Sequence, residues 1–275
     1  MRIAGAQLGY SIGNISAKQS SENAKKRTVI YHHTNLEALI YILRDKCLKF
    51  NRMDNVNDIQ ENEFFKDDEI AKLVYLSCFS YGDESIPMWN IYTSHNEGVR
   101  IGLKIKDGTM FNQVLFDKTR VIKTSSPKNT LPFAFDNKST DYSDKVWMVD
   151  ITPKDVCYNA DVASEPAFIN CGGIYDMNNM ALVKDEAWSY EKETRFAAIL
   201  RTTKGNIEDE STWVDIPDYK FLLVPITFDG ISEMEITFSP WMSDAIKDVV
   251  KLVTDKYVPN VNISFKESKF QGKIR

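Results

Sequence analysis

The chain has 275 residues, enough for one or two domains, and 43% hydrophobic with 12% aromatic residues is ample material for a buried core. This composition excludes a chain that is disordered throughout. The 34 basic and 39 acidic side chains leave a net charge of −5, which argues against a general nucleic-acid coat and leaves only a local basic surface open.

The cysteine spacing and the lengths of the apolar runs indicate the cellular compartment in which the protein is expected. Cys47, Cys78, Cys157 and Cys171 stand far apart with no C-x-x-C pair, so we expect reduced thiols rather than a zinc knuckle or a disulfide framework. The first residues lack the apolar run of a secretion signal, and no stretch approaches the ~20 apolar residues that span a bilayer. A cytoplasmic protein without membrane contact is expected.

The N-terminal part is predicted to be a flexible leader followed by a strand and a helix. Residues 1–27 are polar and show no hydrophobic period. The β-branched and aromatic residues 28–32 predict the first strand. Asn35 is placed to cap a helix whose apolar residues recur at helical spacing over residues 36–43.

The remaining elements point to an α+β fold. Strands are predicted over residues 47–50, 73–80, 98–105, 146–151, 192–200, 221–226, 234–238 and 263–265. Helices are predicted in the acidic run up to residue 70, over 87–92 and 177–188, and after Ser239-Pro240. The polar stretch 118–144 is predicted to be a long loop or insertion. Because strands outnumber helices without regular alternation, a single α+β domain of mostly antiparallel strands, residues 28–275, is expected.

The first site candidate is Tyr31-His32-His33-Thr34, at the end of a predicted strand just before a helix. Backbone N–H groups point outward at such a helix start and can meet a ligand. The structural alternative is that these histidines satisfy local hydrogen bonds. A metal site is less well supported, since neighbouring strand residues project to opposite faces and no third ligand has suitable spacing.

The second candidate is the segment from Trp188 to Leu200. On a strand, period two places Phe196 on the core face and Glu191, Glu193 and Arg195 together on the other. This arrangement is either a surface ladder of charges or a carboxylate pair in a cleft, with the arginine holding one carboxylate ionised.

The third candidate combines two serines with large aromatic residues. Ser77 and Ser80 end a predicted strand, and the Pro87-Met88-Trp89 run with Tyr92 follows. Such a cluster either lines a groove for a planar ring or belongs to the core.

Together these segments resemble a known group of proteins. The patterns are Y-H-x-T, R-x-D-x-x-N-D, S-C-F-S, P-M-W-x-x-Y, G-V-x-I-G and W-x-Y-E-x-E-x-R, between about residues 28 and 200. They resemble a widespread prokaryotic family of uncharacterised domains, many of them near phage-defence genes and related to the ADP-ribosyltransferases. Ile59 departs from that family's pattern, in which proline usually follows the N-D pair.

The resemblance implies a split, mostly antiparallel ADP-ribosyltransferase-like core and a site for NAD. His32-x-Thr34 is similar to the H-x-T motif of the first strand, and Glu191-x-Glu193 is similar to the E-x-E motif. It implies that Glu193 is the catalytic carboxylate and that Glu191 orients the acceptor. The cofactor-binding residues implied are His32 at a ribose hydroxyl, Thr34 as its support, Tyr31, Ser77, Ser80, Tyr81 or Tyr92 at the nicotinamide, and Arg195.

Such a site has a required geometry. We expect His32, Tyr81 or Tyr92, and Glu193 to line one cleft, with Glu191 nearer its mouth and Phe196 turned into the core. Projection of His32 and Glu193 to opposite faces of the sheet would contradict both the site and the ADP-ribosyltransferase interpretation.

The leading hypothesis is therefore an NAD-dependent ADP-ribosyltransferase without a metal, acting as a bacterial or phage toxin or anti-phage defence effector. Its acceptor would be a macromolecule, either a protein or, through the basic tail from Lys266 to Arg275, a nucleic acid. A neutralising antitoxin protein is an expected partner. The alternatives are a non-catalytic ligand-binding or interaction domain of the same fold, and a metal-dependent hydrolase.

Overall fold

The computed structural model describes residues 23–58, 61, 72, 74–106, 110–131, 146–149, 153–158, 170–171, 174–175, 182–202 and 218–274. Its helices are α2 (Leu36–Asp45), α4 (Ile86–Tyr92), α5 (Phe111–Val114) and α7 (Asp244–Tyr257), with 3-10 turns η1 (Met53–Asn55), η3 (His95–Glu97) and η4 (Glu186–Glu191). The longer strands are β1 (Val29–Asn35), β2 (Cys47–Arg52), β3 (Val74–Ser80), β4 (Gly98–Ile105), β13 (Glu193–Thr202), β14 (Phe221–Pro225), β15 (Ile231–Phe238) and β16 (Ile263–Glu267). The shorter ones are β5 (Ile122–Thr124), β6 (Thr130–Leu131), β7 (Val146–Val149), β8 (Lys154–Asp155), β9 (Cys157–Tyr158), β10 (Asn170–Cys171), β11 (Ile174–Tyr175) and β12 (Val183–Lys184).

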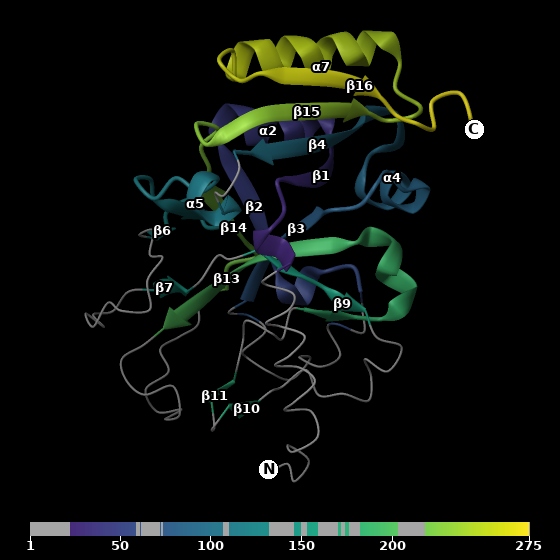
Figure 1. The fold of residues 1–275 in the computed structure, drawn as a ribbon. Coiled ribbons are helices and arrows are strands. Elements are labelled where there is room, and N and C mark those ends of the chain that lie inside the picture. The colour runs from purple at the N-terminus through teal and green to yellow at the C-terminus, as the bar shows by residue number, and fades with distance from the viewer. Residues whose placement is uncertain are drawn as a thin grey trace.

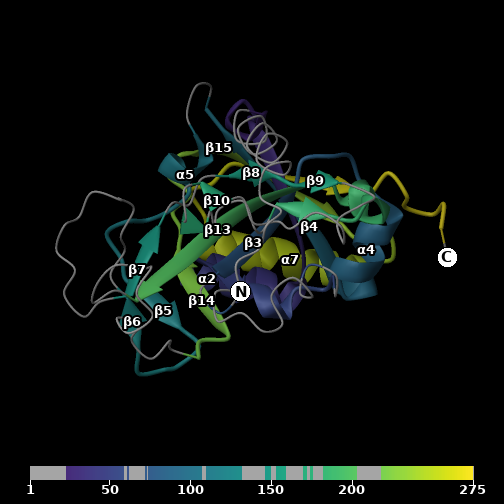
Figure 2. The same cartoon turned by 90° about the horizontal axis from the view of Figure 1, so that it is seen from below.

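Among the described residues, one large, mostly antiparallel sheet of 12 strands confirms the predicted α+β class, and β9 with β12 and β10 with β11 form two separate two-stranded sheets. The strand order of the large sheet is β16-β15-β4-β1-β3-β2-β14-β5-β6, with β13 paired to β3, β7 and β8. In Figure 1, β15 and β16 lie at the top with α7, and β13 runs below β3. Figure 2 shows β13 running diagonally beside β3, with α4 towards one end.

Strand β3 is the point where the sheet divides. Ser80 pairs with Tyr31 of β1 on one edge and with Glu193 of β13 on the other. Leu76, which faces Ala197 of β13, pairs with Asn51 of β2 on the same edge that β1 uses. Residues 77–79 have no partner in β1 or β2 within the described residues. The two halves of the sheet therefore diverge along the middle of β3.

A single apolar core supports this arrangement. Phe196 is fully buried, and its ring packs edge-on against the rings of Phe79 at 5.4 Å and Phe116 at 5.1 Å. Helix α2 joins the same core through Leu39 and Leu43. Its predicted cap is confirmed, because Oδ1 of Asn35 accepts a hydrogen bond from the Ala38 amide at 2.8 Å.

Two predicted element types and one predicted helix start differ from the structure. Strand β12 and turn η4 occupy the described part of the predicted helix 177–188, and residues 177–181 lie outside the described residues. The predicted loop 118–144 contains β5 and β6 in its described part, and 132–144 lies outside it. The last helix begins at Asp244, where the side chain of Ser243 caps it.

The predicted leader also ends earlier than expected. Residues 1–22 lie outside the described residues, but Ala24 is buried and Arg27 forms an ion pair with Asp155. Residues 23–27 therefore belong to the packed structure.

Phe196→Ala should lower the free energy of unfolding by about 3–5 kcal/mol, because it removes a buried ring from between two others. Equilibrium denaturant unfolding measures this change. Leu252→Ala is the control, since Leu252 is 69% exposed and its truncation should change stability by no more than about 0.5 kcal/mol. Equal effects of the two substitutions would contradict the assignment of Phe196 to the core.

Candidate functional site

A cavity of about 260 Å³ lies where the sheet divides. Its lining comes from β1, β2 and β3, the loop after η1, helix α4, β12, η4 and β13. The structure therefore brings together the segments that carry all three site candidates. The predicted site residues that line it are Tyr31, His32, Ser77, Ser80, Tyr92, Glu191, Glu193 and Arg195.

The two other predicted residues, Tyr81 and Thr34, do not line this cavity. The guanidinium of Arg27 covers the Tyr81 ring at 3.4 Å from its centroid. Thr34 is buried and pairs with Val99 in the sheet. Of the two tyrosines considered for the nicotinamide, only Tyr92 is therefore in the cleft.

Glu193 and Arg195 project from β13 on the face predicted for them, opposite to Phe196. Glu191 was expected on the same strand, but it is the last residue of η4. Lys192 follows in the left-handed conformation, with φ of 43°. This turn, rather than strand alternation, returns Glu191 to the cavity.

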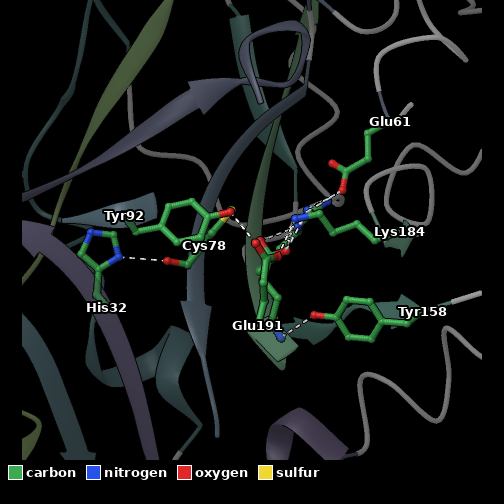
Figure 3. A network of polar contacts seen from close by, with 9 residues as sticks. His32, Glu61, Cys78, Tyr92, Tyr158, Lys184 and Glu191 are labelled. Carbon is green, nitrogen blue, oxygen red and sulfur yellow. Dashed lines mark hydrogen bonds and ion pairs between the residues drawn. The ribbon is translucent and has the colours of Figure 1, made fainter. Parts of the chain in front are cut away.

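Five charged side chains, all of them at least 95% buried, form one cluster: Glu61, Lys184, Glu191, Glu193 and Arg195. All except Glu61 line the cavity, and Figure 3 labels Glu61, Lys184 and Glu191. Arg195 holds both oxygens of Glu193, through Nε to Oε1 at 2.8 Å and Nη2 to Oε2 at 2.9 Å. Nη2 also donates to Oε1 of Glu61 at 2.9 Å. Bidentate pairing of this kind fixes the orientation of a carboxylate as well as its charge.

Lys184 links the three carboxylates from the other side. Its Nζ lies 2.6 Å from Oε2 of Glu191 and 3.3 Å from Oε2 of Glu193. Oε1 of Glu61 is 3.7 Å away. Neither Lys184 nor Glu61 belongs to a motif identified in the sequence, because their partners lie on segments that only the fold brings close.

The two motif glutamates differ in proton affinity. Burial acts to raise the pKa of Glu193, but the positive charges of Arg195 and Lys184 outweigh it and lower that pKa to about 2. Burial raises the pKa of Glu191, and the negative charge of Glu193 raises it further, against the effect of Lys184. Adjacent carboxylates with separated pKa values can take different roles in acid–base chemistry.

Tyr92 is bonded to the second glutamate. Its hydroxyl donates to Oε1 of Glu191. Burial and the charge of Glu191 raise the pKa of Tyr92, so the phenol stays protonated and keeps this bond. Glu191 is 2% exposed and Glu193 4%, so both carboxylates are buried, and the expectation that Glu191 lies nearer the mouth stays a prediction.

His32 reaches the cavity from the other face of the sheet. Tyr31 lies opposite Ser80, and Ser80 opposite Glu193, so these three share a face and His32 alternates away from it. Its ring packs 5.0 Å from that of Phe79. The expectation of a shared cleft with Glu193 is confirmed, and the expectation of a shared face is wrong.

Residues 77–79 of β3, which have no partner in β1 or β2 in the described part of the chain, leave a gap in the sheet, and this gap explains how His32 still lines the cavity. Its Nδ1 lies 2.9 Å from the Cys78 carbonyl oxygen (Figure 3), which belongs to the unpaired stretch of β3. Because a carbonyl only accepts hydrogen bonds, Nδ1 carries the proton and Nε2 remains an acceptor. Burial lowers the pKa of His32, and the hydrogen bond to Cys78 opposes this only in part.

Metal binding has no support among the described residues. In this part of the chain, no group of three or more His, Cys, Asp or Glu side chains is arranged to hold a metal ion. The cysteines whose side chains are described, Cys47, Cys78 and Cys157, are free thiols. None of the helices described is long and apolar enough to cross a bilayer.

Stability should depend on Glu193 in acid. Its folded-state pKa of about 2 lies below the ordinary 4.5, so its ionisation contributes stability above about pH 4.5 and this contribution disappears as the pH falls towards 2. In Glu193→Gln, the free energy of unfolding should fall less steeply across this window. Denaturant unfolding at a series of pH values measures the slopes.

Glu97→Gln, at an exposed carboxylate, is the control for the substitution itself. A wild-type slope in Glu193→Gln would show that the ion pair with Arg195 does not hold this carboxylate ionised.

A family model described as "Protein of unknown function (DUF2971)" matches residues 88–196. The matched segment contains Tyr92, Glu191, Glu193 and Arg195, whereas Tyr31 and His32 precede it. No curated protein and no solved structure matches the chain. The match is consistent with the uncharacterised family that the sequence motifs resemble.

Proposed function

We propose that this protein is an NAD-dependent ADP-ribosyltransferase. The observation that carries the proposal is the state of Glu193, a buried carboxylate held ionised by Arg195 and Lys184 at the wall of a cavity. The same cavity is lined by a histidine of β1 and a tyrosine of α4. These are the residue types that the sequence resemblance assigns to NAD.

The chemistry fits a fixed negative charge. When the bond between nicotinamide and ribose C1′ breaks, its electron pair leaves with the neutral nicotinamide and positive charge develops on the ribose. A preorganised carboxylate stabilises that charge electrostatically, as in glycoside hydrolysis. Glu193 takes this role, and the nucleophilic atom of the acceptor then forms the new bond to C1′.

Glu191 is suited to the acceptor. Its raised pKa allows it to accept the proton that the acceptor's nucleophile loses, and Tyr92 and Lys184 hold its two oxygens. Release of ADP-ribose to water instead would make the protein an NAD glycohydrolase of the same class.

The binding contacts follow from the cavity lining. The Tyr92 ring offers a face for the nicotinamide, and Nε2 of His32 can accept from a ribose hydroxyl. The volume of about 260 Å³ is close to the lower limit of about 300 Å³ for small-molecule pockets. We therefore assign it to the reacting half of NAD, with the remainder along the loop after η1.

The biological role we propose is that of a cytoplasmic bacterial or phage toxin, or an anti-phage defence effector. A macromolecule would be its acceptor, and a neutralising antitoxin protein would restrain it. The net charge of −5 favours a protein acceptor over a nucleic acid. In the basic tail, Lys266 is already paired with Glu235.

The second candidate is a non-catalytic ligand-binding domain, and two observations favour it. Arg195 engages both oxygens of Glu193, as in a purely structural ion pair, and structural networks also shift pKa values. His32 and Glu193 also project from opposite faces of the sheet. Release of nicotinamide from NAD by the purified protein distinguishes an enzyme from such a domain.

Glu193→Gln should reduce the rate of nicotinamide release by at least about a hundredfold while the Kd for NAD changes little, because the lost charge acts mainly on the transition state. Chromatographic detection of nicotinamide gives the rate, and calorimetry gives the Kd.

Glu235→Gln is the matched control, since Glu235 is a buried, ion-paired carboxylate outside the cavity lining. Parallel loss of rate and affinity in Glu193→Gln, or no loss in either, would show that Glu193 does not have the proposed role.

His32→Ala should weaken NAD binding by about tenfold, because it removes the acceptor nitrogen and the ring that closes one wall of the cleft. Calorimetric titration with NAD measures this affinity, and thermal unfolding checks that β1 still pairs. An unchanged Kd would show that His32 does not contact NAD.

A further inference from the structure

Three buried side chains at the cavity have polar atoms without a hydrogen-bond partner among the described residues; one of them, Ser77, projects to the core face with Phe196, and the other two do not. The other two are His33, with both ring nitrogens unpaired, and Ser80, with its hydroxyl unpaired. His33 is 8% exposed and Ser80 4%, and both line the cavity. Buried polar groups are nearly always hydrogen-bonded, so each of these needs an explanation.

Strand pairing places both side chains on the face that carries Glu193. Ser80 lies between Tyr31 of β1 and Glu193 of β13, and paired residues project to the same side of a sheet. His33 follows Tyr31 by two residues and therefore shares that face. His32 differs from His33 in both respects, since it alternates away and its Nδ1 is already bonded.

No described side chain makes a hydrogen bond to His33, although the Nε of Arg100, opposite in β4, also has no partner among the described residues. The rings of His33 and Trp89 pack edge to face with their centroids 5.4 Å apart, but the indole N–H of Trp89 donates to Glu84. Arg100 lies opposite in β4, with its guanidinium stacked on the Tyr31 ring and donating to the Gly82 carbonyl. The unpaired nitrogens are therefore not explained by the packing of α4 or β4 around them.

The chemistry around His33 selects a neutral group. Burial, with the positive charge of Arg100 and the proximity of His32, lowers the pKa of His33 to about 3, so the imidazole offers one donor and one acceptor. The nearby charged cluster has three carboxylates against two cations, a formal charge of −1, and Arg100 opposite His33 brings the sum to zero, so no net positive charge attracts an anion.

We infer that His33 and Ser80 form a subsite for a neutral, planar ligand group that both donates and accepts hydrogen bonds. A primary carboxamide on an aromatic ring has this pattern, and so does the amino-substituted edge of a purine. The inference rests on the proposed function for its choice of ligand, because NAD carries both groups, nicotinamide at one end and adenine at the other.

The test measures binding without turnover. Wild-type protein, His33→Phe and Ser80→Ala are titrated by calorimetry with nicotinamide, with adenosine as the neutral adenine probe, and with nicotinic acid as the anionic counterpart of nicotinamide. We expect one of the two neutral probes to bind the wild type and to lose about tenfold in affinity in each variant. Phenylalanine keeps a ring at position 33, and Ser80→Ala gives an independent result if His33→Phe does not fold.

Thr194→Val is the matched control, since Thr194 is a buried residue whose hydroxyl also has no partner among the described residues, but it projects to the core face. It should leave both affinities unchanged. Loss with nicotinamide places the carboxamide in the subsite. Loss with adenosine places the adenine there and overturns the assignment of the cavity to the reacting half of NAD.

Three outcomes would overturn the inference: neither neutral probe binds the wild type, affinity is unchanged in the folded variants, or nicotinic acid binds as tightly as nicotinamide. Failure of the proposed function gives a different result. If the wild type releases no nicotinamide from NAD but still binds a neutral probe in a manner that depends on His33 and Ser80, the subsite stands and the transferase does not.

Discussion

The bidentate ion pair between Arg195 and Glu193 is the interaction on which the site depends. Both groups are buried, and a buried charge without a partner costs several kcal/mol. The pair alone does not satisfy Lys184, Glu191 and Glu61, which are equally buried and connected to it. The cluster is stable only as a unit, so β12, η4 and β13 must come together around it. This requirement fixes one wall of the cavity.

The opposite wall is set by the backbone of β3. Strand β13 pairs along β3 from Val74 to Ser80, but on the other edge β1 and β2 each take only one end. The Cys78 carbonyl in between is bonded by His32 instead of a strand. A side chain that replaces a ladder hydrogen bond leaves room that a paired strand would fill. The division of the sheet and the histidine in the gap are thus two aspects of one feature, which opens the cavity between the halves.

Local patterns predicted most of the long strands, the cap at Asn35 and the opposite orientations of Phe196 and Glu193, because these depend on residues near in sequence. Most of the site residues that these patterns predicted line one cavity. Strand alternation did not predict the positions of Glu191 and His32, because a turn and the division of the sheet alter them. Glu191 leaves the strand through the left-handed turn at Lys192, and His32 faces away from Glu193 but reaches the cavity through the gap in the sheet. Lys184 and Glu61 were missed because their partners are defined only by tertiary contacts.

The different proton affinities of Glu191 and Glu193 also arise from tertiary structure. Two glutamates separated by a single residue are chemically alike in an extended chain. In the fold, Arg195 neutralises one of them through two hydrogen bonds, whereas the other receives a phenol and shares a lysine. Ionisation of Glu193 then acts on Glu191 across a short distance and raises its pKa, which makes the Glu191 carboxylate the stronger base. A site that holds one carboxylate charged and leaves the next able to accept a proton is matched to a reaction that develops positive charge and then releases a proton. That match, more than the resemblance of the motif, is the physical reason to look for chemistry at this cavity.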